Sequence, residues 1–219
     1  MKITDKTLLE LPLFQGMNAD ELALAKEDMQ KTISHTKRGH DMVSEGDRCD
    51  ALLFVVRGTV RCITESDDHS YSFEEQLHAP LLIEPDRLYG LSQRYSSRYV
   101  AVTACDTISI PKASVAMMME HSMVFRINML NMLSSLSQRR GRAAWHQQSE
   151  DIEKRIVRFI KDHLQYPAGQ KLLVIKMVTL ARELGCSRLE ISQALHSLEQ
   201  KELIIIRRSA VEIPMAERL

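Results

Sequence analysis

The stretch TLARELGCSRLEISQALHSLEQKELI, residues 179–204, decides the fold of the C-terminal third of the chain. Thr179 can cap a short helix, and Gly185 stands where that helix must stop and the chain must reverse, a position suited to a left-handed conformation. Ser187 opens a second helix with Glu190 three residues on, the Ser-x-x-Glu pattern of a capping box. The stretch therefore predicts two helices joined by a tight turn, with both boundaries set by side-chain chemistry.

The periodicity of the second helix predicts which of its faces is exposed. Ile191, Leu195 and Leu198 recur at i, i+4 and i+7, so they face the core. Arginine can bond guanine bidentately, glutamine can bond adenine, and an exposed leucine can touch a thymine methyl. We interpret Glu190 as a cap and not as a base reader. The opposite face therefore suits the major groove of DNA, and it carries Arg188, Leu189, Ser192, Gln193 and His196.

A hairpin follows the two helices, with strands at Leu203–Ile206 and Val211–Ile213. Two arginines at its tip suit a wing that grips phosphates, and the free N–H groups of a helix start favour a phosphate as well. The alternative is a small helical domain whose surface is merely polar. The residues predicted to contact DNA are Thr179, Ser187, Arg188, Leu189, Ser192, Gln193, His196, Arg207 and Arg208.

Composition supports DNA binding only weakly, because 29 Lys and Arg balance 29 Asp and Glu among 219 residues. The length favours two domains. The N-terminus, MKITDKTLLELPLF, has no long apolar core, and no apolar stretch approaches the roughly 20 residues of a membrane span, so we expect neither a signal peptide nor a membrane helix. Cysteines 49, 62, 105 and 186 form no C-x-x-C pair, which predicts cytoplasmic thiols and no metal site.

The N-terminal half has the texture of an antiparallel β protein. After a helix capped by Asn18 and Glu21, short apolar runs alternate with turn signals from Thr32 to about Pro111. This spacing predicts a sandwich or jelly roll, and Arg57-Gly58 predicts a tight hairpin. The runs are Ala51–Val56, Thr59–Thr64, Tyr71–Leu77 and Tyr99–Ala104.

From Lys112 to about Gln148 the sequence is helical. A 4-3-4-3-4 spacing predicts the a/d seam of a parallel dimeric coiled coil, although the methionines in it also fit an ordinary core helix. The polar run Arg139–Glu150 predicts a hinge. The seam is Phe125, Met129, Met132, Leu136, Arg139 and Ala143, with Leu130, Leu133 and Ser137 on a neighbouring face.

The predicted fold class is therefore α+β, in three parts. Residues 1–111 form an antiparallel β jelly roll that acts as an effector domain. Residues 112–149 form a long dimerisation helix and a hinge, and residues 150–219 form a winged helix-turn-helix.

The run Gly185–Arg188, followed by Ile191–Leu195, resembles the Crp/Fnr family of bacterial regulators, and the likeness extends over nearly the whole chain. Phe14-x-Gly16, Glu45-Gly46-Asp47 and residues 53–58 resemble that family's cyclic-nucleotide-binding-like domain. The resemblance implies DNA reading by Arg188, Leu189 and Gln193. Because Leu189 and Gln193 replace the family's usual acid and second arginine, it leaves the target sequence open.

The resemblance also implies an effector site. The family's phosphate-binding stretch corresponds to Leu82-Ile83-Glu84 and Arg98-Tyr99-Val100, where Ile83 replaces a glycine and Tyr99 a small hydroxyl residue. These departures argue against cyclic AMP and leave another cyclic nucleotide or small effector open, with no cofactor assigned. The iron–sulfur branch's N-terminal cysteine cluster is absent. The effector-binding residues implied are Glu84, Arg98, Tyr99, Arg139 and Arg140.

The sequence thus predicts a cytoplasmic transcription regulator, a homodimer on two half-sites of double-stranded DNA about 34 Å apart, with RNA polymerase as a further partner and no membrane contact. The alternative is a ligand-sensing module that acts through protein contacts and carries a vestigial DNA-binding domain. An enzyme is not predicted, since the sequence lacks His-x-His, His-Glu-x-x-His and Gly-x-Ser-x-Gly patterns.

Overall fold

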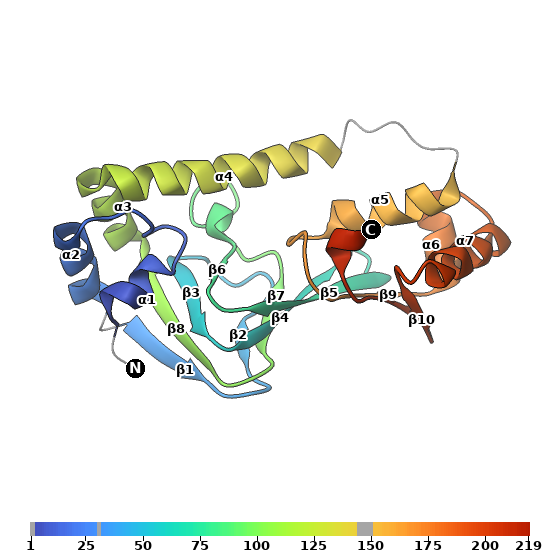
Figure 1. Cartoon of the computed structure of the whole chain (residues 1–219), viewed down its shortest axis with the longest axis horizontal. Coiled ribbons are helices and arrows are strands. Elements are labelled where there is room, and N and C mark those ends of the chain that lie inside the picture. Colours follow the sequence, from blue (N-terminus) through green and yellow to red (C-terminus); the bar gives the residue numbers. More distant parts are fainter. Residues whose placement is uncertain (1–2, 30–31, 144–150) are drawn as a thin grey trace. The chain divides into compact units, whose positions relative to one another are not determined.

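The computed structural model describes residues 3–29, 32–143 and 151–219. The chain forms two compact units, shown in Figure 1. Unit 1 comprises Met1–Val60 and Leu77–Gly141, and unit 2 comprises Arg61–Gln76 and Arg142–Leu219. Residues 61–76, which the sequence groups with the effector domain, thus lie in the unit that holds the C-terminal domain. Among the described helices, none combines the length and the apolar character needed to cross a membrane.

Unit 1 contains two short helices followed by antiparallel strands. The predicted cap of the second helix is confirmed, because the Asn18 N–H donates to Glu21 Oε2 at 3.0 Å and the Glu21 N–H donates to Asn18 Oδ1 at 3.0 Å. One sheet has the order β1-β8-β3-β6, and β2 pairs with β7 in the other. The predicted α+β fold with antiparallel sheets is confirmed. The elements are α1 (Asp5–Leu9), α2 (Ala19–Met29), β1 (Ile33–Thr36), β2 (Asp41–Val43), β3 (Ala51–Arg57), β6 (Leu81–Ile83), η2 (Pro85–Arg87), β7 (Arg98–Ala101) and β8 (Cys105–Pro111).

The predicted hairpin at Arg57-Gly58 is wrong. β3 lies in one sheet, whereas the next strand, β4 (Thr59–Glu65), lies in the other, so the chain crosses between sheets at this point. Gly58 has φ +107°, and a Cβ there would lie 2.6 Å from Cys105 Sγ and 2.7 Å from the Ala104 carbonyl oxygen. The crossing therefore requires glycine both for its backbone conformation and for the close approach.

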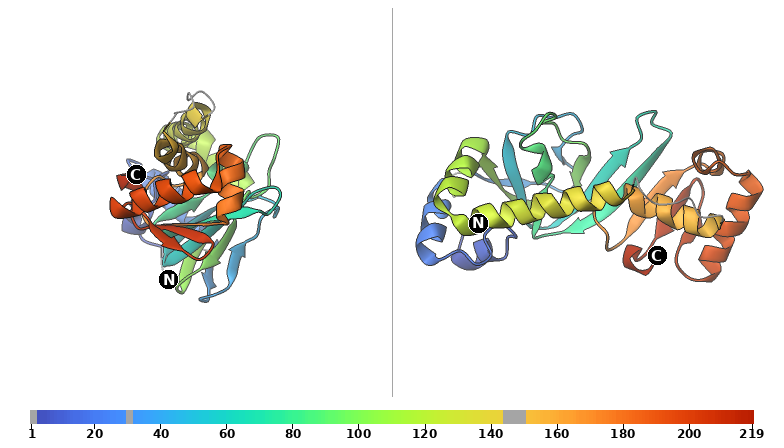
Figure 2. Two further views of the ribbon diagram at one scale, coloured as in Figure 1. Left: turned by 90° about the vertical axis from the view of Figure 1, so that its right-hand side faces the viewer. Right: turned by 90° about the horizontal axis from the view of Figure 1, so that it is seen from above.

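The helix predicted from Lys112 is broken into α3 (Lys112–His121) and α4 (Met123–Ala143), and Figure 2 shows the turn between them. Ser122 is extended, with φ −117° and ψ 113°, and its Oγ accepts the Phe125 N–H at 3.1 Å. A serine that caps the following helix interrupts the preceding one. The rest of the predicted helix, to Gln148, and most of the predicted hinge fall outside the described residues.

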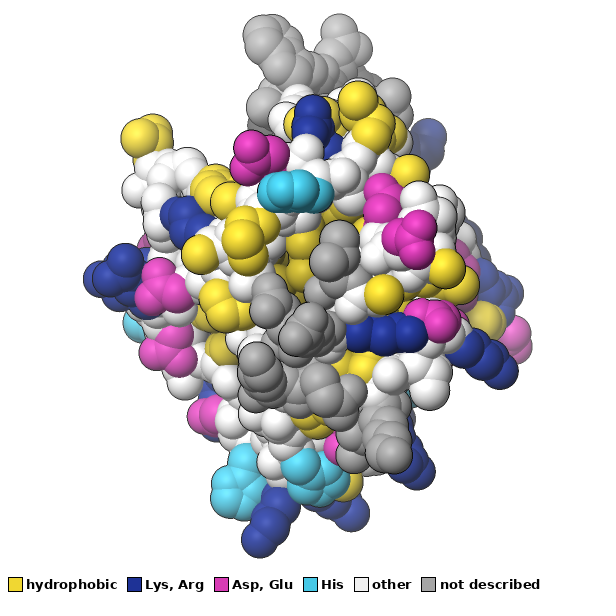
Figure 3. Space-filling model, turned by 90° about the vertical axis from the view of Figure 1, so that its left-hand side faces the viewer, with side chains coloured by type: hydrophobic (Ala, Val, Ile, Leu, Met, Phe, Trp, Pro, Cys, Tyr) yellow, Lys and Arg dark blue, Asp and Glu magenta, His cyan; other side chains and the backbone are white. Residues whose placement is uncertain are grey.

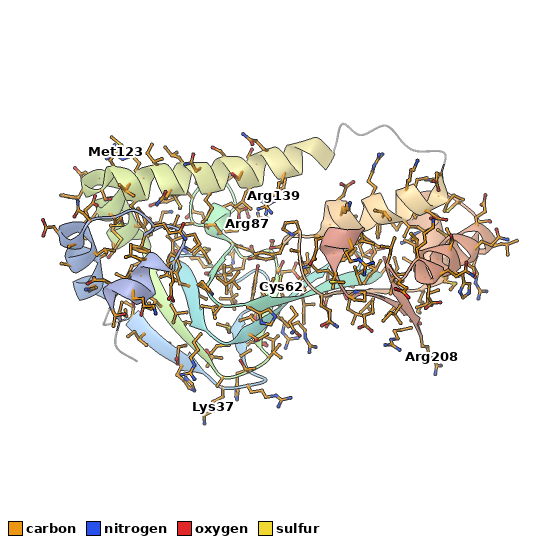
Figure 4. The ribbon with its side chains drawn as sticks, in the orientation of Figure 1. Lys37, Cys62, Arg87, Met123, Arg139 and Arg208 are labelled. Atoms are coloured by element: carbon orange, nitrogen blue, oxygen red, sulfur yellow. The ribbon has the colours of Figure 1, made fainter. Side chains whose placement is uncertain are left out.

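The predicted dimer seam is also wrong at its first two positions. Phe125 and Met129 are fully buried within unit 1, where the Phe125 ring lies 5.3 Å from that of Phe14. This part of α4 is a core helix, the alternative that its methionines favoured. A different face is exposed, and on it Met123, which points away from the sheets in Figure 4, Ile127 and Leu130 are 62%, 46% and 49% accessible.

Charged side chains of the described residues form no single patch on the face of unit 1 that Figure 3 shows. Over the end of this unit that carries α1, α2 and α3, basic and acidic groups are scattered among hydrophobic ones, as Figure 3 shows. This mixture agrees with the balanced charge of the sequence, and it leaves the apolar face of α4 as the more distinctive exposed feature of the unit.

Unit 2 is a winged helix-turn-helix with an additional strand pair. Its sheet has the order β10-β11-β9-β5-β4, with β5 (Tyr71–His78) contributed from the N-terminal half. The helices bury Ile156, Ile160, Leu180 and Leu195 against it. The other elements are α5 (Ile152–His163), β9 (Lys171–Ile175), α6 (Met177–Leu184), α7 (Arg188–Gln200), β10 (Ile205–Arg207), β11 (Ala210–Ile213) and η3 (Ala216–Arg218).

The crossing at Gly58 generates a stability prediction. Gly58→Ala should lower the free energy of unfolding by about 1–3 kcal/mol more than Gly39→Ala, because the added methyl overlaps the Ala104 carbonyl. Gly39 is the matched control, since it also has a positive φ, +82°, but nothing within 4 Å of the added carbon. Urea denaturation measures both variants, and equal losses would show that the close approach is not a constraint.

Candidate nucleic-acid interface and effector pocket

The turn between α6 and α7 has the predicted geometry. Gly185 is left-handed at φ +58°, and its N–H donates to the Arg182 carbonyl at 3.1 Å. The Cys186 N–H donates to the Ala181 carbonyl at 3.0 Å, so the last turn of α6 is closed before the chain reverses. Thr179 is not a cap, which corrects the sequence prediction: α6 starts directly after β9, with Lys176 as its N-cap, so Thr179 lies within the first turn.

The capping box at the start of α7 is confirmed. The Ser187 N–H donates to Glu190 Oε2 at 2.8 Å, and the Glu190 N–H donates to Ser187 Oγ at 3.2 Å. The hydrogen bonds from the Ser187 backbone and then from its side chain lower the pKa of the Glu190 carboxyl from its ordinary 4.5. The one acid in the first turn of α7 is thus hydrogen-bonded to its own helix end.

The faces of α7 also follow the prediction. Ile191, Leu195 and Leu198 are buried. On the other side Leu189 is 67% accessible, Arg188, Gln193 and His196 are exposed, and Ser192 is half-buried. His196 Nδ1 lies 3.5 Å from Glu199 Oε2 on the same helix. The exposed face is therefore a contiguous strip of basic, amide and apolar groups beside the helix start.

The wing is a tight hairpin in which β10 pairs with β11 around Arg208 and Ser209, the latter at φ +57°. The Arg207 guanidinium donates to Glu212 Oε2 at 3.0 and 3.2 Å, so it lies along the hairpin. Arg208 projects from the tip, as Figure 4 shows.

Sequence reasoning missed Val178, an apolar side chain that is 66% accessible in the first turn of α6. A helix predicted to start at Met177 would have placed Val178 in that first turn.

The predicted effector residues are brought together only in part, since Glu84 and Tyr99 are buried and joined by a side-chain hydrogen bond. Glu84 is buried, and its Oε2 accepts the N–H and O–H of Ser96 at 2.7 and 3.0 Å; burial raises the pKa of this carboxyl against the effect of those bonds. Tyr99 is fully buried. Arg98 is exposed and donates to Asp41, at 2.9–3.1 Å. Neighbouring residues of a strand point to opposite faces, and here the tyrosine takes the inner one.

A cavity of about 620 Å³ opens in unit 1 between residues 85–90 and α4, within the usual size range of small-molecule sites. Arg140, which forms an ion pair with Asp86, is the one predicted effector residue on its wall, and the next residue back, Arg139, is exposed. Sequence reasoning did not assign the rest of the wall to an effector site, because the wall comes from two segments far apart in the chain, residues 85–90 and α4. The lining residues are Pro85, Asp86, Tyr89, Gly90, Leu133, Leu136, Ser137, Arg140 and Gly141.

The chain is similar in sequence to one known regulator and in fold to several solved structures. No family model matches the chain. The cAMP-activated global transcriptional regulator Vfr of Pseudomonas aeruginosa is 21% identical over 193 residues, which cover 82% of this chain and 90% of Vfr. Among solved structures, CprK complexed with OCPA has a TM-score of 0.50 at 14% identity and covers 90% of this chain and 93% of CprK. The Thermus thermophilus Catabolite Activator Protein has a TM-score of 0.49 at 20% identity, and the match covers 94% of this chain and 95% of that protein.

An antiparallel β domain, a long helix and a winged helix-turn-helix with an exposed second helix define a DNA-binding regulator with an effector domain. The Gly185–Leu195 motif and the similarity to Vfr along most of its length both support the resemblance of this chain to transcription regulators of the Crp/Fnr type.

The capping box generates a pH prediction. Because the pKa of Glu190 is lowered in the folded chain, its charge should stabilise the fold above pH 4.5 and lose that effect as the pH falls through the folded-state pKa. Glu190→Gln should therefore be less stable than the wild type at pH 7, and the difference should shrink toward pH 3. Urea unfolding at several pH values measures it. Glu202→Gln, at an exposed acid just beyond α7, is the control, and parallel pH profiles for the two variants would contradict the assignment.

Proposed function

We propose that α7 enters the major groove of duplex DNA and that the β10–β11 hairpin contacts the flanking phosphates. The observation that carries this proposal is the exposed strip on α7, whose neighbouring acid is held in the capping box. Arg188 and Gln193 can read base edges, and Leu189 can meet a thymine methyl. The full set of proposed contacts is Thr179, Ser187, Arg188, Leu189, Ser192, Gln193, His196, Arg207 and Arg208.

In this proposal two copies of the chain act together. The exposed apolar row Met123, Ile127 and Leu130 on α4, with spacings of four and three, is a seam suited to a second copy. Two recognition helices then meet two half-sites about 34 Å apart. The dimer acts in the cytoplasm, contacts RNA polymerase and performs no catalysis. Residues 112–149 serve as the dimer helix and hinge between the effector part and the DNA-binding part.

The effector part is proposed to take a small molecule in the cavity lined by Asp86, Tyr89 and Arg140. Leu133 and Leu136 give the cavity an apolar side, and the Asp86–Arg140 ion pair supplies polar groups that orient a ligand. Of the other residues that the resemblance implies, Glu84 and Tyr99 form the buried support behind it, and Arg139 lies next to Arg140 at its exposed end.

Selection of bound sequences from random duplexes, followed by binding titrations, tests DNA reading. Arg188→Ala should lower affinity for the selected site by about 1–3 kcal/mol and relax the preference at one base pair, if its guanidinium bonds a guanine. Arg208→Ala should instead weaken all sequences equally and reduce the salt slope by about 1. Arg218→Ala, at an exposed arginine in η3, is the control that should change neither. A failure of the wild type to bind any duplex at low salt would favour the ligand-sensing module.

Vfr is described as cAMP-activated, but we predict that cyclic AMP does not bind this chain. The buried Ile83 and Tyr99 side chains occupy the place of small residues, and Arg98 is engaged by Asp41 at the surface. Millimolar cyclic AMP should therefore change affinity for the selected duplex by less than twofold in a mobility-shift titration. Saturable binding seen by calorimetry would contradict this prediction.

A further inference from the structure

The hairpin formed by residues 61–76 completes the sheet of the DNA-binding unit. β5 pairs antiparallel with β9 in five consecutive registers, from Tyr71↔Ile175 to Glu75↔Lys171. On its other edge β9 pairs with β11 of the wing. Without β5, the edge of β9 would present unpaired N–H and C=O groups, which native sheets avoid.

The same hairpin supplies part of the hydrophobic core of unit 2. Phe73 is buried among Leu173, Ile156 and Ile160, which all belong to the C-terminal region. Its ring stacks on His163 of α5 at 5.3 Å with the planes 9° apart, and Tyr71 Oη lies 3.1 Å from His163 Nε2. Removing the hairpin would therefore expose apolar core as well as an edge.

A buried ion pair joins the hairpin to β9. Lys171 Nζ lies 3.0 Å from Glu75 Oε2, and the two side chains are 0% and 1% accessible. Glu75 also accepts the Gln165 N–H at 2.8 Å and the Tyr166 N–H at 3.0 Å, so it orders the segment after α5. A buried lysine without a counter-charge is strongly unfavourable, and Glu75 supplies that charge.

At the tip of the hairpin, a surface contact reaches the helix-turn-helix itself. Asp68 Oδ2 accepts a hydrogen bond from Arg182 Nη2 of α6 at 3.1 Å. α6 follows β9 directly and ends in the Gly185 turn that sets the direction of α7. The hairpin thus contacts the strand before α6 and α6 itself.

We propose that residues 61–76 are a structural part of the DNA-binding unit and the positioning element for α7. Both strands of the hairpin continue into unit 1, at Val60–Arg61 and at Gln76–Leu77. The hairpin is therefore covalently continuous with unit 1 at both ends and hydrogen-bonded to β9 within unit 2. The DNA readout below rests on the proposed function; the cross-linking readout does not.

A disulfide across the β5–β9 register tests the pairing in the full chain. Ser72 and Val174 are directly opposed, so Ser72→Cys/Val174→Cys, made with Cys186→Ser, should close on mild oxidation, as mapped by mass spectrometry. Ser72→Cys/Leu172→Cys, two residues out of register, is the control and should close at least tenfold more slowly. The closed 72–174 bridge should leave DNA affinity within threefold of the open form. No bridge, or a bridge that costs tenfold or more in DNA affinity, overturns the proposal.

Glu75→Gln tests the positioning role, with Glu74→Gln as its matched control, since Glu74 pairs with Arg61 inside the hairpin. Glu75→Gln should speed amide hydrogen exchange of β9 at least tenfold and weaken DNA binding, whereas Glu74→Gln should change both less than twofold. Adding the 72–174 bridge to Glu75→Gln should restore DNA affinity when oxidised and lose it again when reduced. A bridge that forms without restoring affinity overturns the positioning role. Absence of DNA binding by the wild type rejects the proposed function but leaves bridge formation as a test of the pairing.

Discussion

The direction of α7 depends on the three residues between it and α6. Gly185 takes a left-handed conformation that other residues adopt only with strain, and Ser187 ends the reversal by capping α7 at once. Because the turn is this short, the buried residues Ile191, Leu195 and Leu198 fix the rotation of α7 about its axis. The exposed strip at Arg188 and Leu189 is a consequence of that rotation. Its accessibility is therefore set by packing on the opposite face, and changes in the core of unit 2 alter it.

The buried Lys171–Glu75 pair sets a second constraint, on which parts of the chain fold together. Lys171 belongs by sequence to the C-terminal domain, and its charge requires a partner from the N-terminal half. The compact unit is therefore discontinuous in sequence. A pair of this kind adds little net stability compared with an apolar replacement, but it disfavours alternative registers strongly, since a shifted β5 would leave two buried charges uncompensated. The ion pair therefore selects one register of β5 against β9, which apolar contacts alone would specify less strictly.

Local signals in the sequence predicted the start of α7 and its buried face. The features that the sequence did not predict depend on long-range contacts. The capping boxes at Asn18 and Ser187 and the turn at Gly185 depend on residues within four positions, which the sequence displays directly. The glycine at 58 has the same local appearance as a hairpin turn, but its role is decided by Cys105, far along the chain. The heptad spacing of α4 could not distinguish two faces, and Phe14 decides that the face of Phe125 is the inner one. In the same way, Asp41, far from Arg98 in the sequence, determines which acid the Arg98 side chain pairs with.

The effector region shows how one substitution can redirect a site. Tyr99 fills the space beside Glu84 and hydrogen-bonds to it, and the burial of this tyrosine makes β7 present Arg98 to the surface. Glu84 then bonds to Ser96 and has Arg87 Nε at 3.6 Å, so its polar contacts are internal. The open space lies instead farther along, between η2 and the second half of α4, where Arg140 and Asp86 meet. The wall residues Leu133 and Leu136 belong to the same helix, α4, that carries the exposed apolar row, so a molecule in this cavity would contact that helix. The cavity thus adjoins α4, whereas Glu84 and Arg98 have polar contacts elsewhere, with Ser96 and Asp41 respectively.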